Sequence, residues 1–479
     1  MAALGLGAAT AGTLFSLLAC DRKEMSVPAS KSPISPAPKP SLTPALPIPP
    51  VPLSGGTYPQ TIIVIGAGIA GLSSASALHG FGHQVTVLEG RKRIGGRSWT
   101  YRSLDNIPLD LGASWIHGFM GNPITGLSLF KGMRYKVTDY GSKVLYNTEG
   151  RLISKGEETT IEERFFRILT ESISKACSSK ENGVSLQEAI NSNVEFNNLS
   201  SSELLQFNYS LNTWFEHDAS GSARALSACH YADGSRFAGD DVILLDGYAP
   251  ILEEMAQGLN IQLEQVVESV DYSKDQTEVR TNQGSFIADK VIVTLPLGVL
   301  KKGTVKFIPE LPKKKQTAIE KLGMGVLNKL YLRFPYVFWD REVDWIGYIP
   351  QDHGEWAEWL NISKYINQPI LLGFNAADYG KRIENLTDKS IVSIGMEVLR
   401  KIYGSIPTPE SVLITRWASD PFAYGSYSFI AAGATGEDYD TLAEPVSGKL
   451  YFAGEATSQY GSTVHGAYIS GQREANRIE

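Results

Sequence analysis

The stretch that decides the fold is TIIVIGAGIAGLSSASALHGFGHQVTVLE, residues 61–89. Residues 61–65 form a short β-branched run, which is typical of a buried parallel strand, and residues 84–88 form a second one. Between them, glycines permit a tight turn, a close approach of backbone to a pyrophosphate, and packing of a helix on the sheet. Glu89 ends the second strand, where a carboxylate can accept hydrogen bonds from ribose hydroxyls. The sequence therefore predicts a βαβ dinucleotide site that uses Gly66, Gly68, Ala70, Gly71 and Glu89.

Bulk composition limits the other possibilities. A chain of 479 residues exceeds what one hydrophobic core usually supports, so at least two domains are expected. The net charge of −7 argues against a nucleic-acid-binding protein, and it would help attract a cationic substrate, although solubility explains it equally well. The three cysteines and seven histidines show no metal-ligand spacing, so no metal site is expected.

The N-terminus has the composition of a targeting segment. Residues 1–20 are uncharged and largely apolar, and they end in a Leu-x-Ala-Cys pattern that resembles the bacterial lipobox. Residues 21–57 are rich in proline and predict a disordered tether. These features predict export to the bacterial periplasm, or membrane tethering through a lipidated Cys20. No basic residues precede the apolar run, so either the true start lies upstream or the lipobox pattern is accidental.

A second glycine motif, Arg93-Ile94-Gly95-Gly96-Arg97, follows Glu89 closely. Arg97 can bind phosphate oxygens in a bidentate manner, whereas the same residues alone would indicate only a solvated basic loop. With this motif in place, the chain resembles the FAD-dependent amine oxidase superfamily, which includes monoamine oxidases, polyamine oxidases and flavin-dependent histone demethylases. The resemblance spans residues 58–479 and implies FAD rather than NAD.

The resemblance also assigns roles to later segments. Residues 109–118, LDLGASWIHG, are similar to the segment beneath the flavin, which implies that Gly112, Ala113, Ser114 and Trp115 bind the cofactor. His117 would lie at the substrate channel, as in polyamine and spermine oxidases, although a lone histidine is more often structural. Val267 would contact the adenine end through its backbone, although a buried valine needs no such role.

Three more segments complete the resemblance. Lys329, in the run 325–334, matches the lysine that holds a water beside flavin N5. Lysine suits this task because desolvation readily shifts its pKa. Tyr427, in the run 416–428, matches an active-site aromatic residue. Glu455 would approach the ribityl-phosphate region, and Thr463 and Val464 begin a helix whose N-terminus would face the flavin pyrimidine.

Departures from the family pattern refine the expected substrate. Ser426 stands where monoamine oxidases carry the flavin-bonded cysteine, which implies non-covalent FAD. Thr463 replaces a second cage aromatic residue, and the resulting half-open cage suits a long polyamine. Glu216 and Asp218 are candidate carboxylates of the substrate channel, together with Trp115, although an exposed helix end explains the two acids equally well.

The expected architecture is an α/β, Rossmann-like FAD-binding domain of the GR2 type, interleaved with an α+β substrate-binding domain of mixed sheet and helices. The FAD-binding domain comprises residues 58–120, 236–310 and 440–479, and the substrate-binding domain comprises residues 121–235 and 311–439. The expected activity is FAD-dependent oxidation of spermine- or spermidine-type amines, with O2 reduced to hydrogen peroxide and the imine hydrolysed. The catalytic residues would be Lys329, His117, Tyr427 and Thr463.

Alternatives remain open at this point. An L-amino-acid oxidase would need an arginine for the substrate carboxylate, and the Trp115-Ile116-His117 segment offers none. A histone demethylase is less favoured because no long helical insertion or chromatin-binding module is visible. Rab GDP-dissociation inhibitors keep a related fold without redox activity, but Arg97, Lys329 and Glu455 together oppose that interpretation. A dehydrogenase that uses another electron acceptor is also compatible with the sequence.

Overall fold

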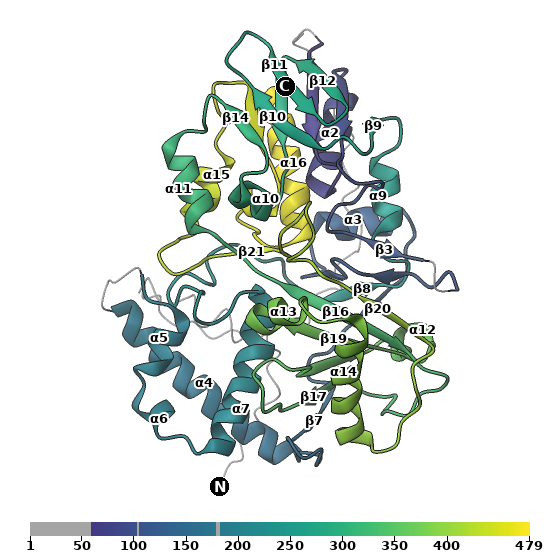
Figure 1. Cartoon of the computed structure of the whole chain (residues 1–479), viewed down its shortest axis with the longest axis vertical. Coiled ribbons are helices and arrows are strands. Elements are labelled where there is room, and N and C mark those ends of the chain that lie inside the picture. Colours follow the sequence, from purple (N-terminus) through teal and green to yellow (C-terminus); the bar gives the residue numbers. More distant parts are fainter. Residues whose placement is uncertain (1–58, 103–104, 179–182) are drawn as a thin grey trace, which may run out of the picture.

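The structure, a computed structural model, describes residues 59–102, 105–178 and 183–479. The predicted signal segment, the tether and Cys20 lie outside the described residues. Within those residues, no helix has both the length and the apolar character needed to cross a membrane. Two portions, each built on its own large sheet, lie one above the other in the view of Figure 1, and the chain passes between them several times.

The first portion is built on a five-stranded parallel sheet in the order β22-β13-β1-β2-β9. These strands are Thr61–Ile65 (β1), Gln84–Leu88 (β2), Asn260–Gln262 (β9), Lys290–Val293 (β13) and Leu450–Phe452 (β22). The central strand β1 is almost fully buried, because helices or a second sheet cover both faces of a parallel sheet. The sequence-based prediction of an α/β Rossmann-like fold is therefore confirmed.

Helices cover one face of this sheet. Helix α2 (Ile69–Gly80) packs against the C-terminal helix α16 (Val464–Ile478), with Gly471 against the Ala70 carbonyl. Helices α3 (Pro123–Phe130) and α9 (Ala249–Met255) contribute to the same core. The other face packs on a four-stranded sheet in the order β12-β11-β10-β14. Its strands are Val267–Asp271 (β10), Thr277–Thr281 (β11), Gly284–Ala288 (β12) and Lys306–Ile308 (β14).

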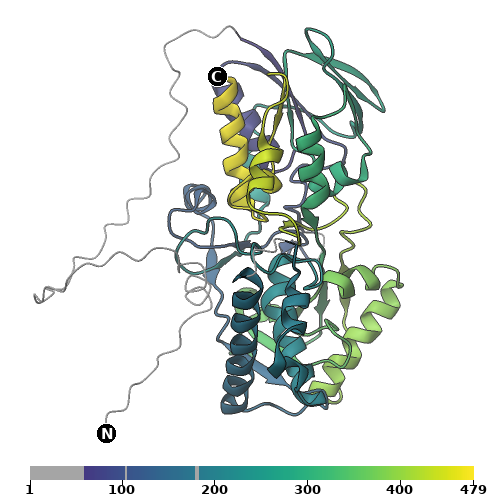
Figure 2. The same cartoon turned by 90° about the vertical axis from the view of Figure 1, so that its left-hand side faces the viewer.

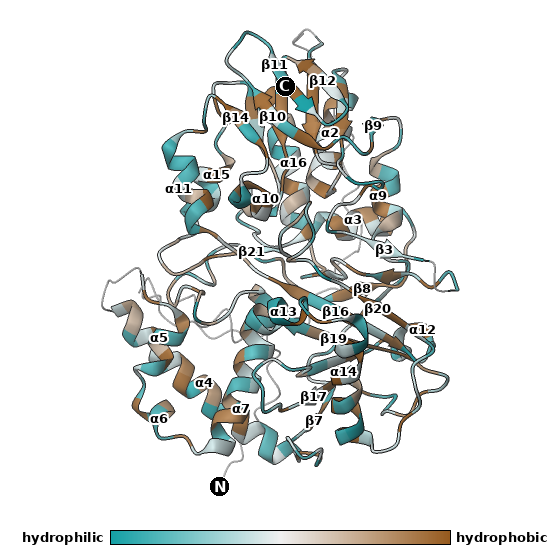
Figure 3. Ribbon diagram, viewed as in Figure 1, coloured by the Kyte–Doolittle hydropathy of each residue, from teal (hydrophilic) through white to brown (hydrophobic). Residues whose placement is uncertain are grey.

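The second portion is built on a six-stranded mixed sheet in the order β20-β16-β19-β18-β17-β7. Its strands are Lys143–Tyr146 (β7), Leu327–Arg333 (β16), Trp345–Tyr348 (β17), Glu358–Asn361 (β18), Ile370–Ala376 (β19) and Ser411–Ile414 (β20). Helix α14 (Asp388–Tyr403) packs its apolar face on this sheet. Strand β19 is buried along its whole length, and β16 along most of it, as expected for strands covered on both faces. In Figure 3, β16 shows teal as well as brown because it carries polar residues among its apolar ones.

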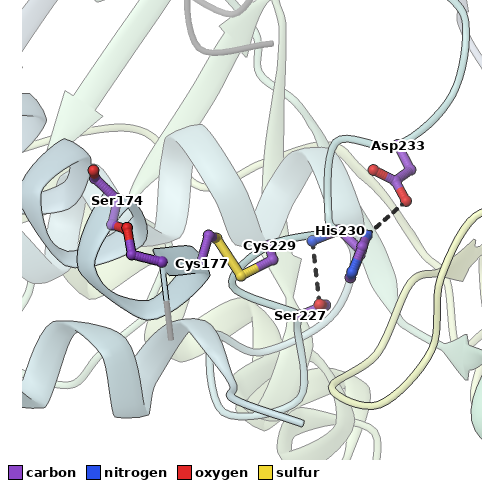
Figure 4. The surroundings of a disulfide bond; sticks show 7 residues. Ser174, Cys177, Ser227, Cys229, His230 and Asp233 are labelled. Atoms are coloured by element: carbon purple, nitrogen blue, oxygen red, sulfur yellow. Dashed lines mark hydrogen bonds and ion pairs between the residues drawn. A yellow bond between two sulfur atoms is a disulfide. The ribbon is translucent and has the colours of Figure 1, made fainter. Parts of the chain in front are cut away.

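A helical layer lies beside this sheet, visible at the lower left of Figure 1 and side-on in Figure 2. It contains α4 (Lys155–Ser178), α5 (Leu186–Asn191), α6 (Val194–Asn197), α7 (Ser201–Leu211), a π-helical turn (Asn212–Glu216) and α8 (His217–Ala219). A disulfide bond joins Cys177 near the end of α4 to Cys229, 52 residues later (Figure 4). Cysteine spacing did not predict this pairing.

The remaining elements are short and lie within the two portions or between them. They are β3 (Thr100–Tyr101), β4 (Leu109–Asp110), β5 (Trp115–Ile116), β6 (Tyr135–Val137), β8 (Val242–Leu244), α10 (Leu297–Lys302), α11 (Lys313–Lys321), β15 (Gly323–Met324), α12 (Ser363–Ile366), α13 (Ala377–Ile383), β21 (Ser428–Phe429), α15 (Glu437–Ala443) and the 3-10 turn Glu455–Thr457. Strands β5, β6 and β8 form a small antiparallel sheet. The residue boundaries predicted for the two domains remain predictions.

Candidate active site

The predicted glycine turn has the geometry of a phosphate cradle. Gly66 adopts φ +105°, which side chains rarely allow, and a Cβ on Gly71 would lie 1.9 Å from the Gly66 carbonyl oxygen. Gly68 caps helix α2 without a side-chain hydrogen bond, so the backbone N–H groups of the first turn are left for an anion. Glu89 is buried and accepts hydrogen bonds from the Ala67 and Arg91 amides, and each carboxylate oxygen keeps a second lone pair.

The second glycine motif packs directly on the first. The Gly95 amide donates to the Ala67 carbonyl, and Gly68 pairs with Gly95 as neighbouring backbone. Behind this turn, a Cβ on Gly112 would lie 1.7 Å from the Arg97 carbonyl oxygen. Both glycine motifs and the Gly112 segment therefore meet at one place.

Arg97 links this region to the end of strand β22. Its Nη1 donates to Glu455 Oε1 at 2.8 Å and to the Ser426 carbonyl at 3.0 Å. Glu455 is buried, and it also accepts hydrogen bonds from the Ser428 hydroxyl and the Ser462 amide. Both carboxylate oxygens of Glu455 therefore accept hydrogen bonds from the protein itself, and Glu455 holds the Arg97 side chain in position. A cavity beside the pair is lined by both residues together with Leu297, Phe452, Gly454 and Thr457.

Lys329 is buried beneath the Gly112 segment. Its Nζ donates to the Asp110 and Gly112 carbonyls, at 2.8 and 2.6 Å, and to the Ser114 hydroxyl at 2.5 Å. Burial lowers the pKa of Lys329 to about 8, against the opposing charge of Asp110. A lysine with this pKa can hold or exchange a proton near neutral pH.

An aromatic wall extends outward from Lys329. The Trp115 ring lies 6.0 Å from Lys329 Nζ and stacks on Trp345, with 6.1 Å between ring centroids. Phe374 tilts against both tryptophans, and Tyr140 stacks on Trp345 at 5.4 Å. The sequence indicated Trp115 alone, because the other three rings come from separate strands and loops.

His117 is half-exposed beyond this wall. Its Nδ1 lies 2.8 Å from Asp241 Oδ2, which also accepts the Tyr140 hydroxyl at 3.1 Å. Burial lowers the pKa of His117, but the charge and the hydrogen bond of Asp241 together have the larger effect. The net pKa of His117 therefore lies above its usual value. Asp241 is a residue that sequence reasoning missed, because it lies in irregular backbone directly before β8 without a recognisable motif.

The N-terminus of helix α16 lies at the same region. Thr463 caps it by accepting from the Gly466 amide at 2.9 Å, and Val464 starts the helix. His465, one residue on, is buried and receives a hydrogen bond at Nδ1 from the Asn122 side chain, which also donates to the His117 carbonyl. Burial lowers the pKa of His465 to about 4, so its ring is neutral at pH 7.

The two candidate channel acids have different environments. Asp218 is exposed and lies 3.4 Å from Arg236. Burial raises the pKa of Tyr427, and the charge of Asp218 raises it further. Glu216 is buried and pairs with His353 at 2.7 Å, while the Ala223 amide and the Asn212 side chain donate to it. Its carboxylate is therefore held in the protein interior by three neighbouring residues, and the role of Glu216 as a channel carboxylate stays a prediction. Tyr427 donates to the His217 carbonyl at 2.5 Å.

The residues present fit an FAD molecule. Val267 is buried at the start of β10, and the preceding Gln265 amide donates to the Glu89 carbonyl, which places Val267 beside the nucleotide end. The Gly112 segment links Arg97 to Lys329, because the Ala113 amide donates to the Arg97 carbonyl and Lys329 Nζ donates to the Gly112 carbonyl. Within the described residues, no group of three or more His, Cys, Asp or Glu side chains could hold a metal ion.

Comparison with known proteins agrees with this geometry. The chain is 35% identical over 451 residues to human lysine-specific histone demethylase 2, a match that covers 88% of this chain and 53% of that protein. It is 35% identical over 435 residues to FLOWERING LOCUS D of Arabidopsis thaliana, covering 87% of this chain and 55% of the relative. The chain thus spans about half the length of these curated relatives.

A solved structure of putrescine oxidase bound to putrescine shares the fold, with a TM-score of 0.73 and 19% identity over 88% of this chain and 99% of the other. The model of the family of flavin-containing amine oxidoreductases matches residues 69–479. This family and the shared fold imply FAD as the cofactor. The chain belongs to the flavin-containing amine oxidoreductase family.

Proposed function

We propose that this protein is an FAD-dependent polyamine oxidase, which oxidises a carbon–nitrogen bond of spermine- or spermidine-type amines and passes the electrons to O2. The observation that carries the proposal is a set of three carboxylates around one tyrosine of the aromatic wall. The pKa of Tyr140 lies well above its usual value because its hydroxyl is desolvated and because Asp241, Asp218 and Glu358 all act on it. Carboxylates beside an aromatic wall suit a substrate with several ammonium groups.

FAD, when bound, accepts the hydride equivalent from the carbon next to the amine nitrogen. The protein's own residues prepare the substrate. The stacked rings of Trp115 and Trp345 exclude water and supply an apolar surface for methylene groups. Low-dielectric walls favour the neutral amine at the reacting nitrogen. Lys329 holds its proton-exchanging Nζ between the Asp110, Gly112 and Ser114 oxygens.

Non-covalent attachment of FAD is part of the proposal. Ser426 carries no thiol, and its hydroxyl donates to the Leu327 carbonyl and accepts from the Leu327 amide. Export is also proposed, and the Cys177–Cys229 disulfide supports it because disulfides persist in oxidising compartments. A lipid anchor at Cys20 remains a proposal from the sequence.

A second candidate is oxidation of an N-methylated lysine side chain in a peptide, which the 35% identity to lysine-specific histone demethylases favours. A methyl-lysine is also an aliphatic amine, so the same inner site would accept it. The two candidates differ in what surrounds the amine: a second ammonium group in a polyamine, or a peptide backbone in a histone tail.

Anaerobic reduction of the flavin separates these candidates. Purified yellow protein is mixed with spermine, spermidine, putrescine, a methyl-lysine peptide, leucine or phenylalanine, and the loss of flavin absorbance is followed. Polyamines are expected to bleach the flavin at low concentration. Bleaching by the peptide alone would favour the demethylase, bleaching by amino acids alone would favour an L-amino-acid oxidase, and a colourless protein that takes up no FAD would contradict any oxidase.

A further inference from the structure

Across the substrate sheet, one row of side chains connects Lys329 to a second charged group. Lys329 on β16 is directly opposite Phe374 on β19, and Phe374 is directly opposite Glu358 on β18. Residues directly opposite one another in antiparallel strands point to the same face, with Cα atoms about 5 Å apart. Glu358 therefore stands on the same face as Lys329, about 10 Å away along the row.

His217 lies over the middle of this row. Its ring centroid is 6.1 Å from that of Phe374, and its Nδ1 is 3.2 Å from Glu358 Oε2. Its side chain is 10% exposed, and its backbone carbonyl accepts the Tyr427 hydroxyl. His217 follows the π-helical turn Asn212–Glu216, and such turns often occur at functional sites because they re-aim the next side chains.

Among the residues that the structure describes, one nitrogen of His217 has no hydrogen-bond partner. Nε2 is buried and makes no hydrogen bond to any of the described residues. Glu358 can only accept, so Nδ1 carries the hydrogen and a neutral ring presents Nε2 as a lone-pair acceptor. A buried acceptor without a partner is unfavourable, and buried polar groups in folded proteins are nearly always paired. The unpaired nitrogen therefore indicates a donor that comes from outside the chain.

We infer that His217 Nε2 takes the proton of the substrate ammonium, with Glu358 stabilising the imidazolium that results. This inference rests on the proposed amine oxidase function. In the step, one N–H bond of the ammonium breaks, an N–H bond forms at Nε2, and the positive charge moves from the substrate to the His217–Glu358 pair. The amine then reaches the flavin in the neutral form that hydride transfer requires. An alkylammonium group has a pKa near that of lysine, about 10.4, so without such a base little neutral amine is present at pH 7.

Several other ionisable groups face the His217–Glu358 pair, and their charges affect the pH dependence of flavin reduction. The charges of Glu358, Asp218 and Asp241 converge on the Tyr140 hydroxyl, and Tyr209 lies near Glu358 and Lys143 beneath the sheet. The groups around the imidazole are Glu358 on β18, Asp218 next to His217 on α8, Tyr427 just before β21, Lys329 on β16, and Tyr140 with Asp241 at the outer wall.

The test is the pH dependence of anaerobic flavin reduction by putrescine and spermidine, measured in the FAD-loaded wild type and in His217→Gln between pH 6 and 10. The wild type is expected to reach its full second-order reduction rate near neutral pH. His217→Gln is expected to be at least tenfold slower at pH 7 and to recover wild-type rates near pH 10, where the amine is already neutral in solution. Glu358→Gln, which keeps an acceptor for Nδ1 but loses the charge, is expected to give an intermediate profile.

His353→Gln is the matched control, because it alters a second histidine–carboxylate pair, in which His353 holds the same turn through the buried Glu216. Its pH profile is expected to match the wild type. Binding is followed by NMR. The histidine C–H resonance that is missing from the His217→Gln spectrum belongs to His217, and in the dithionite-reduced wild type this resonance is expected to shift when putrescine is added.

Unchanged rates in His217→Gln at pH 7, or a loss by the same factor at every pH, would overturn the inference and leave the proposed function intact. If His217→Gln does not fold, the Glu358→Gln profile decides in the same way. A wild-type protein that no amine reduces would overturn the proposed function and this inference together.

Discussion

Arg97 and Glu455, 358 residues apart in the chain, form an ion pair with 2.8 Å between Nη1 and Oε1. Arg97 is the last residue of the second glycine motif, and Glu455 follows the last strand of the parallel sheet. The pair therefore joins the second glycine motif to the end of the parallel sheet. Breaking a buried pair of this kind typically costs about 3–5 kcal/mol.

Replacing Glu455 by Gln is expected to weaken FAD binding at least tenfold. The new amide NH2 would face donors, since Arg97, the Ser428 hydroxyl and the Ser462 amide all point at the carboxylate. FAD binding is measured from flavin fluorescence, both while the FAD-loaded protein is diluted and while the apoprotein is reconstituted with FAD. Asp246→Asn, which alters an exposed pair with Arg134, is the control and should retain FAD normally.

Replacing Lys329 by Met is expected to slow flavin reduction or reoxidation by about 100-fold while FAD stays bound. The reason is the loss of a buried amine that contacts the Gly112 segment. Lys315→Met is the matched control, because Lys315 is also buried with its pKa lowered to about 7 by burial, but it donates to carbonyls at the end of α15. It should lower the melting temperature and leave turnover unchanged. Loss of FAD from Lys329→Met would recast Lys329 as structural.

Replacing Gly71 by Ala is expected to destabilise the protein by about 3 kcal/mol or more and to abolish FAD binding. The added methyl would overlap the Gly66 carbonyl oxygen, which is backbone and has no room to move. Gly126→Ala, inside helix α3 with open space around it, should be neutral or stabilising by up to about 1 kcal/mol. Denaturant unfolding of both variants checks this. Equal stabilities would show that the cradle tolerates a side chain.

The disulfide predicts a redox-dependent stability. Closing a loop of 52 residues between Cys177 and Cys229 removes unfolded-state entropy worth about 4 kcal/mol. The double variant Cys177→Ser, Cys229→Ser should unfold at lower denaturant concentration than the oxidised wild type, and reductant should lower only the wild-type midpoint. An equal response of both proteins to reductant would contradict the bond.

His465 is expected to contribute to the loss of folding stability at acid pH. Burial lowers its folded-state pKa to about 4, against about 6.5 when unfolded. For a group with a depressed pKa, the contribution to stability is fully present above pH 6.5 and is lost as pH falls toward 4. This linkage amounts to up to about 3 kcal/mol. His465→Asn keeps an acceptor for Asn122 but does not titrate, so its melting temperature should fall less than that of the wild type between pH 7 and 4. Parallel curves would show that His465 protonates freely in the fold.

The sequence by itself determined the local motifs and their cofactor. The strand, glycine turn and acid at residues 61–89, the glycine pair before Arg97, and the Gly112 segment are short-range patterns, in which each residue's task is set by neighbours a few positions away. The family resemblance followed from their order, and both the fold class and FAD agree with the comparisons.

The tertiary structure alone decided which side chains meet. Sequence placed Glu216 and Asp218 together as channel acids, but the π-helical turn buries Glu216 against His353 and leaves Asp218 outside. Sequence reasoning missed Asp241, Glu358 and His217, which come from a loop, a strand and a short helix. Their proximity depends on the cross-strand register of β16, β19 and β18 and on the packing of the helical layer, which are long-range properties without a local sequence signature.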